Sequence, residues 1–149
     1  MYKVQNYING KVLNSESKDY LKIFNPTTGE LQGEVVNSND KDFELLIQSS
    51  SDAFYEWSNE TPLRRSRILA KYKNLIEKNL DDLAKIISSE HGKTLEDAKG
   101  SVTRGLEVVE FACGIPHLLK GEFSQNVGRN IDSWSVRQPI GVTAGITPF

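Results

Sequence analysis

One cysteine and two histidines are the residues of this chain that most readily support nucleophilic or metal chemistry. Cys113 lies in the stretch EFACGIP, four residues before His117, and His91 lies further upstream. A cysteine becomes a ready nucleophile beside a cation or at a helix N-terminus. We expect Cys113 near the C-terminal end of a helix, where the helix dipole has the opposite sign. We therefore interpret Cys113 as a small buried hydrophobic residue and assign no catalytic residue.

The sequence predicts no metal site. It contains no HxH, HxxxH or CxxC element, the short spacings in which metal ligands recur. Neighbouring acids such as Asp81 and Asp82 are interpreted as the exposed face of a helix.

Arg104 lies on a predicted helix face of small residues. It adjoins Gly105 in a stretch with small residues at helical spacing, namely Ala98, Val102, Gly105, Val109 and Ala112. A face of small residues lets a neighbouring element approach closely. Arg104 is either an arginine on the helix surface or a residue with a functional role, and both interpretations stay open.

The last fifteen residues, SVRQPIGVTAGITPF, combine glycines with a hydroxyl in Gly141, Gly145 and Thr147. Glycine lets the backbone come close to a ligand. Neither GxGxxG nor GxxxxGK[ST] is present, so the motif alone is a weak indication of nucleotide binding. The run IGVTAGI is apolar or small throughout, which is typical of a strand buried on both faces in a parallel sheet.

Strands and turns dominate the first part of the chain. Asn9-Gly10 is a strong signal for a two-residue hairpin loop. Residues 20–24 and a run ending at Val36 are predicted strands, joined by a turn that contains Pro26 and Gly29.

Three helices are predicted to follow. Asn39 or Asp40 caps the first, and Thr61-Pro62 opens the second, whose apolar stripe runs to His91 before a stop at Gly92. Thr94 caps the third helix, which Gly114 and Pro116 end. Residues 121–138 then alternate between polar and apolar around Ile131 and Trp134, as in a half-exposed strand or a two-stranded arm.

Composition favours a soluble globular chain. Of the 149 residues, 38% are hydrophobic and 26% charged, with a net charge of −2, which gives no reason to expect nucleic acid or an anionic membrane as partner. No apolar stretch approaches the roughly 20 residues of a membrane span. The single cysteine and the lack of a recognisable secretory signal favour a cytoplasmic location, or an organelle matrix if a transit peptide was removed.

The predicted fold class is α/β, with hairpins and helices that end in the first strand of an incomplete parallel sheet. Parallel neighbours of that strand require crossover connections. We therefore expect the chain to be the front part of a larger α/β protein.

Two separated stretches resemble the aldehyde dehydrogenase superfamily. They are RQPIGVTAGITPF and SSEHGKTLEDA. In the second stretch, Glu90, Gly92 and Lys93 match that superfamily's Glu-x-Gly-Lys element. The stretch GLEVVEFACGIPHLLKGEFSQNV is similar to the CoA-acylating methylmalonate-semialdehyde dehydrogenase branch. The resemblance extends over essentially the whole chain.

The resemblance implies NAD-dependent oxidation of methylmalonate or malonate semialdehyde to propionyl-CoA or acetyl-CoA, with loss of CO2 and with coenzyme A as co-substrate. It implies that Thr147 and Phe149 line the NAD pocket and that Arg104 holds the carboxylate of the semialdehyde. Residues 1–149 would be the N-terminal part of the NAD-binding domain, with about 121–138 as the oligomerisation arm of a homotetramer.

The same resemblance places the nucleophilic cysteine and the glutamate base beyond the equivalent of Phe149. The catalytic domain would then be absent, and the chain alone is expected to be inactive. Two alternatives remain: a part of a non-acylating NAD(P)-dependent aldehyde dehydrogenase, or a non-catalytic assembly module.

Overall fold

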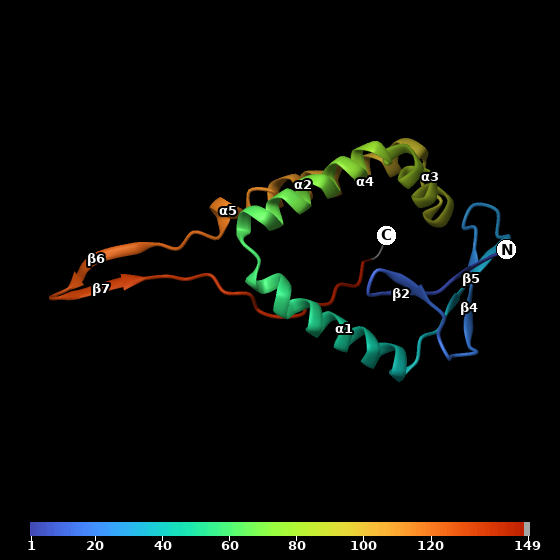
Figure 1. Cartoon of the computed structure of the whole chain (residues 1–149). Helices are drawn as coiled ribbons and strands as arrows, with labels where there is room; N and C mark the ends of the chain where they lie inside the picture. Colours follow the sequence, from blue (N-terminus) through green and yellow to red (C-terminus); the bar gives the residue numbers. More distant parts are fainter. Residues whose placement is uncertain (148–149) are drawn as a thin grey trace.

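The computed structural model describes residues 1–147, which form a mixed α/β structure. The strands are β1 (Tyr2–Val4), β2 (Asn6–Ile8), β3 (Lys11–Leu13), β4 (Tyr20–Phe24), β5 (Leu31–Val36), β6 (Phe123–Gly128) and β7 (Ile131–Trp134). The helices are α1 (Asp40–Asn59), α2 (Pro62–Lys78), α3 (Leu80–His91), α4 (Leu95–Ala112) and α5 (Ile115–Leu118). The helices and two of the small sheets surround an opening, and β6 and β7 project away from it (Figure 1).

A three-stranded sheet in the order β1-β5-β4 stands at one end of the opening. β1 runs parallel to β5 and β4 antiparallel to it. Gly33 of β5 lies opposite Tyr2, and a Cβ at Gly33 would come within 2.7 Å of the Tyr2 carbonyl oxygen. A glycine at this position therefore allows β1 and β5 to pair.

The predicted hairpin is confirmed as β2 and β3, which pair antiparallel. Asn9 and Gly10 both have positive φ, 51° and 72°, as a tight two-residue loop requires. The hairpin is held to the start of α1 by hydrogen bonds from Ser15 to the Asp42 carboxylate and from Ser38 to the Asn6 side chain.

The predicted helix starts are confirmed. The Asn39 side chain accepts a hydrogen bond from the Asp42 amide, and the Asp42 carboxylate accepts one from the Asn39 amide, which completes a capping box at α1. The Thr61 and Thr94 side chains cap α2 and α4. Each cap satisfies an amide that the helix itself leaves unpaired.

The prediction of one uninterrupted helix from Pro62 to His91 is wrong. The Asn79 side chain donates to the Leu75 carbonyl oxygen at 2.7 Å, and Asn79 has φ −109° and ψ 16°. The side-chain amide of Asn79 competes with the backbone amide for this carbonyl at the point where α2 ends and α3 begins. The predicted stop at Gly92 is confirmed, and Gly92 has φ 80°. A Cβ at Gly92 would lie 3.0 Å from the ring of Pro26.

The predicted strand over 140–146 is not formed. Residues 139–147 have no regular secondary structure, and the exposed fraction of the Ile140 side chain is 91%. A strand exists only through its hydrogen-bonded neighbours, and no strand within residues 1–147 pairs with this segment.

Residues 121–138 contain a two-stranded arm, which is one of the two alternatives that the sequence predicted. β6 and β7 pair antiparallel, with Phe123 opposite Trp134. At the base of the arm the Ser135 amide donates to the Glu122 carbonyl oxygen at 2.9 Å. A Cβ on Gly121 would overlap the Ser135 carbonyl oxygen, so glycine allows the two strands to converge there.

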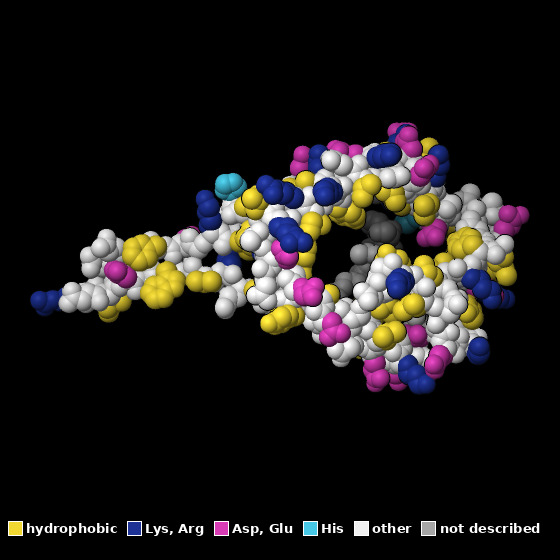
Figure 2. Space-filling model, viewed as in Figure 1, with side chains coloured by type: hydrophobic (Ala, Val, Ile, Leu, Met, Phe, Trp, Pro, Cys, Tyr) yellow, Lys and Arg dark blue, Asp and Glu magenta, His cyan; other side chains and the backbone are white. Residues whose placement is uncertain are grey.

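Little of this structure is buried. The hydrophobic side chains buried within residues 1–147 are Ile8, Val36, Ala84 and Ala98. The accessible surface is 11807 Å², whereas a compact protein of 16.7 kDa exposes about 7,600 Å². Figure 2 shows hydrophobic side chains along the inner rim of the opening.

No helix within residues 1–147 has the length and apolar character that a membrane crossing requires.

Asp42 makes the attachment of the hairpin to α1 dependent on pH. The Ser15 hydroxyl and then the Asn39 amide lower the pKa of the Asp42 carboxyl below its ordinary value. The resulting stabilisation is present above the ordinary pKa and is lost as the pH falls through the lower pKa of the folded state. Hydrogen exchange of the β2 and β3 amides should therefore accelerate, beyond the intrinsic rate change, as the pH falls below the ordinary pKa of 3.8 for an aspartate.

Asp42→Asn should remove most of this pH dependence. Asp40→Asn is the matched control, since Asp40 is also in the first turn of α1. Equal pH profiles for Asp42→Asn and the unaltered chain would contradict the assignment.

Candidate functional site

Arg104 lies in the middle of α4, a helix that packs against α2 and α3. Ala98 is fully buried at this contact, and Val102 and Val109 are half-buried. Gly105 does not belong to the packed face: it is exposed, and no atom lies within 4 Å of the place where its Cβ would be. The predicted close approach at Gly105 is therefore wrong for residues 1–147.

The guanidinium of Arg104 is exposed and held by one side chain of its own helix. Its Nη2 donates to the Ser101 hydroxyl at 3.2 Å. No carboxylate within residues 1–147 forms an ion pair with it. Since a guanidinium carries five N–H donors, most remain available to an anion.

Lys93 reaches the same hydroxyl. Its Nζ donates to Ser101 Oγ at 3.0 Å, while its main-chain carbonyl accepts from the Ser88 hydroxyl at 2.7 Å. Ser101 was not predicted as a site residue. Its position three residues before Arg104 places the two on one face of α4, a relation that spacing alone reveals.

The residues predicted to line a nucleotide pocket are not brought together with Arg104 by any described contact. Residues 141–143 line a hollow of about 340 Å³ along α1, together with Ser50, Ala53, Phe54 and Trp57. Thr147 is exposed, and Phe149 lies outside the described residues. Gly141 has φ 111°, a conformation that favours glycine.

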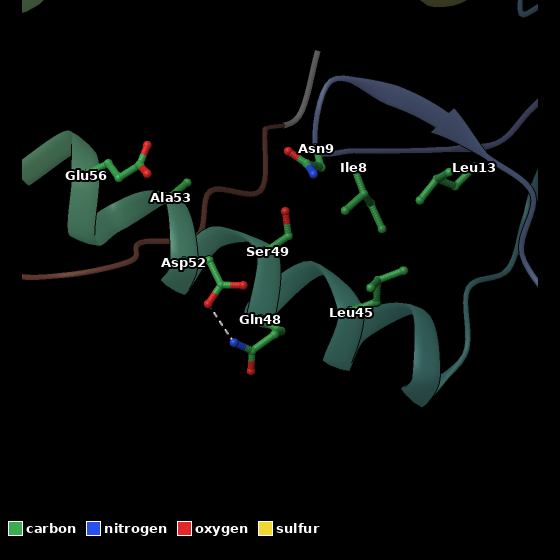
Figure 3. A pocket seen from close by; sticks show the side chains of 9 residues that line it. All are labelled: Ile8, Asn9, Leu13, Leu45, Gln48, Ser49, Asp52, Ala53 and Glu56. Atoms are coloured by element: carbon green, nitrogen blue, oxygen red, sulfur yellow. Dashed lines mark hydrogen bonds between the residues drawn. The ribbon is translucent and has the colours of Figure 1, made fainter.

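A second hollow, of about 470 Å³, lies between the β2–β3 hairpin and α1. Figure 3 shows Ile8, Asn9 and Leu13 facing α1 across it, and Gln48 donating to Asp52 at 2.8 Å. None of the predicted site residues lines it. Asp52 and Glu56 make its polar side acidic, which is unsuited to a carboxylate or a phosphate.

Cys113 is partly enclosed and contacts the neighbouring helix α2. It is half-buried at the C-terminal end of α4, as predicted for its helix position, and its carbonyl oxygen accepts from the Ser66 hydroxyl at 2.6 Å. His117 follows in α5. Within residues 1–147 no three histidine, cysteine or acidic side chains are grouped so that they could hold a metal ion.

The fold is that of the N-terminal part of aldehyde dehydrogenases. A protein of Sinorhizobium meliloti, assigned as a methylmalonate-semialdehyde dehydrogenase and crystallised with NAD, superposes with a TM-score of 0.89 at 45% identity, over 95% of this chain and 29% of that one. The methylmalonate-semialdehyde dehydrogenase of Oceanimonas doudoroffii gives a TM-score of 0.88 at 42% identity, over 94% of this chain and 28% of that one.

The chain belongs to the aldehyde dehydrogenase family, whose sequence pattern matches residues 12–149. Within that family it is 48% identical to malonate-semialdehyde dehydrogenase of Pseudomonas aeruginosa, over 100% of this chain and 30% of that protein. It is 40% identical to the acylating methylmalonate-semialdehyde/malonate-semialdehyde dehydrogenase of Mus musculus, over 98% of this chain and 27% of that protein. The chain thus spans less than a third of the length of these relatives.

Proposed function

We propose that these residues serve as the N-terminal segment of an NAD-dependent, CoA-acylating dehydrogenase for methylmalonate or malonate semialdehyde. The observation that carries the proposal is Arg104, an exposed guanidinium that is held from one side and has no carboxylate partner within residues 1–147. The similarity to malonate-semialdehyde dehydrogenase supports the same substrate class.

Arg104 would hold the carboxylate of the semialdehyde. A guanidinium binds a carboxylate through two parallel hydrogen bonds, which fix its orientation as well as its charge. The aldehyde group, at the other end of a short substrate, is then set at a defined distance from α4. An aldehyde without a carboxylate gains nothing from this contact.

The segment after Gly141 fits a role in binding NAD. Residues 142–147 are exposed, and no atom lies within 4 Å of the place where a Cβ of Gly145 would be, so the backbone there is open to a ligand. We propose Thr147 and Phe149 as cofactor-binding residues, and NAD in the Sinorhizobium meliloti structure supports NAD as the cofactor. NAD would supply the hydride acceptor, and coenzyme A would take the acyl group.

We assign no covalent step to the described residues. Cys113 is the only cysteine in the chain, and it packs at the end of α4 with its carbonyl bonded to Ser66. The proposed contribution of residues 1–149 is binding and orientation, so the chain alone should not oxidise aldehydes. The single, half-buried cysteine also agrees with the cytoplasmic location that we propose.

The β6–β7 arm is proposed to pair with a second copy of the protein in a homotetramer. It exposes a large apolar surface, including 71% of the Trp134 side chain, together with Phe123 and Val136. Its strands also carry unpaired backbone groups at both edges, and such edges favour pairing with another strand.

The pair of changes Phe123→Ser and Trp134→Ser should reduce the size of the assembly in sedimentation velocity. Tyr55→Ser, on the exposed surface of α1, is the matched control and should leave the assembly intact. An unchanged assembly in the arm variant would rule out this interface.

Arg104→Ala tests the substrate. A charge-assisted hydrogen bond is worth roughly 1.5–3 kcal/mol, so the kcat/KM of the complete dehydrogenase for malonate semialdehyde should fall about 10- to 100-fold. The value for propanal, which has no carboxylate, should change little. Arg104→Lys should restore activity only in part, because an ammonium lacks the planar fork.

Cys113→Ala is the control in the same assay and should leave both substrates unaffected. Equal losses for malonate semialdehyde and propanal in Arg104→Ala would show that Arg104 is structural. Loss of all turnover in Cys113→Ala would overturn the assignment of that cysteine.

A further inference from the structure

The Ser101 hydroxyl is a contact shared by two cations. It accepts hydrogen bonds from Lys93 Nζ at 3.0 Å and from Arg104 Nη2 at 3.2 Å. It donates its own proton to the Asp97 carbonyl oxygen at 3.1 Å. A hydroxyl offers one donor and two acceptor positions, so all three are used and its orientation is fixed.

We propose that Lys93, Ser101 and Arg104 form one clamp for the substrate carboxylate, in which Ser101 is the positioning residue. Ser101 holds the ammonium and the guanidinium side by side, so that a single carboxylate contacts both. The inference rests on the proposed function and extends it, because it adds a second binding cation and the group that sets its place.

The backbone sets the position from which each side chain of the clamp extends. Ser101 and Arg104 share a face of α4 through their spacing of three residues. Lys93 precedes the N-cap residue Thr94, and its side chain extends along the first turns of the helix to Ser101. The bond from Ser88 to the Lys93 carbonyl anchors the base of that side chain.

Electrostatics favours an anion at this place. A carboxylate beside the Ser101 hydroxyl is attracted by both positive groups. The planar guanidinium supplies two parallel hydrogen bonds, and the ammonium, a compact charge with three donors, supplies a third from another direction. A carboxylate held from two directions cannot rotate about a single contact, which orients the aldehyde as well.

Four variants separate the roles. Ser101→Ala removes the shared acceptor and suits a helix interior, so it should not unfold α4. Ser101→Thr retains a hydroxyl and should restore the wild-type behaviour. Lys93→Gln removes the second cation. Lys99→Gln is the matched control, since Lys99 is on the same helix but its ammonium pairs with Asp81 at 3.0 Å.

The experiment measures kcat and KM of the complete dehydrogenase for malonate semialdehyde and for propanal. Ser101→Ala and Lys93→Gln should each raise KM for malonate semialdehyde about 3- to 10-fold, the size of one hydrogen bond, with kcat and the propanal values nearly unchanged. Ser101→Thr and Lys99→Gln should match the wild type. A general structural defect would instead affect both substrates.

Wild-type KM in both Ser101→Ala and Lys93→Gln, with Arg104→Ala still selective for malonate semialdehyde, would overturn the clamp and leave the proposed function intact. A full-length protein that oxidises no aldehyde would refute the proposed function. The clamp would then be decided by titrating the full-length protein with malonate in a calorimeter. Saturable binding that is weakened by Ser101→Ala and by Lys93→Gln supports the clamp, and its absence overturns it.

Discussion

The shortage of buried apolar surface is the constraint on which the rest of this structure depends. Within residues 1–147, five helices and two of the three small sheets surround an opening instead of packing around a shared core. Tyr72, Leu75 and Ile86 are among the apolar side chains left exposed on α2 and α3. Exposed apolar area of this extent is the property of an element that packs against more protein. The arrangement nevertheless superposes on the same part of related dehydrogenases, so the open form is the native geometry of this segment.

Within that open form, α4 packs against both α2 and α3, and it carries the candidate site. Ala98 packs it against its neighbours, Lys99 pairs with Asp81 of α3 at 3.0 Å, and Glu110 pairs with Lys73 of α2 at 3.4 Å. Both ion pairs are open to solvent, which screens them, so packing holds the helix more than charge does. A rigid helix gives Arg104 a defined starting point, and the contact with Ser101 restricts its remaining freedom. Affinity for a carboxylate benefits because less side-chain entropy is lost on binding.

Local chemistry made most of the elements predictable, and long-range partners decided where prediction failed. The Asn9-Gly10 hairpin follows from the positive φ values that its loop demands, and the caps at Asn39 and Thr61 follow from unpaired amides. The helix break at Asn79 was missed because the apolar stripe continues across it. The strand at 140–146 was wrong because a strand requires a neighbour that no composition supplies. Arg104 could be proposed from residue type and resemblance, whereas the reach of Lys93 to Ser101 depends on a side-chain path that spacing does not specify.

The central claim is that residues 1–149 need further protein surface to complete a stable fold. Sedimentation velocity of the isolated chain at several concentrations, with calorimetry of the same samples, tests it most directly. The account predicts association that increases with concentration and no sharp unfolding transition of a monomer. A species that stays monomeric across the concentration range and unfolds in one cooperative transition would contradict it.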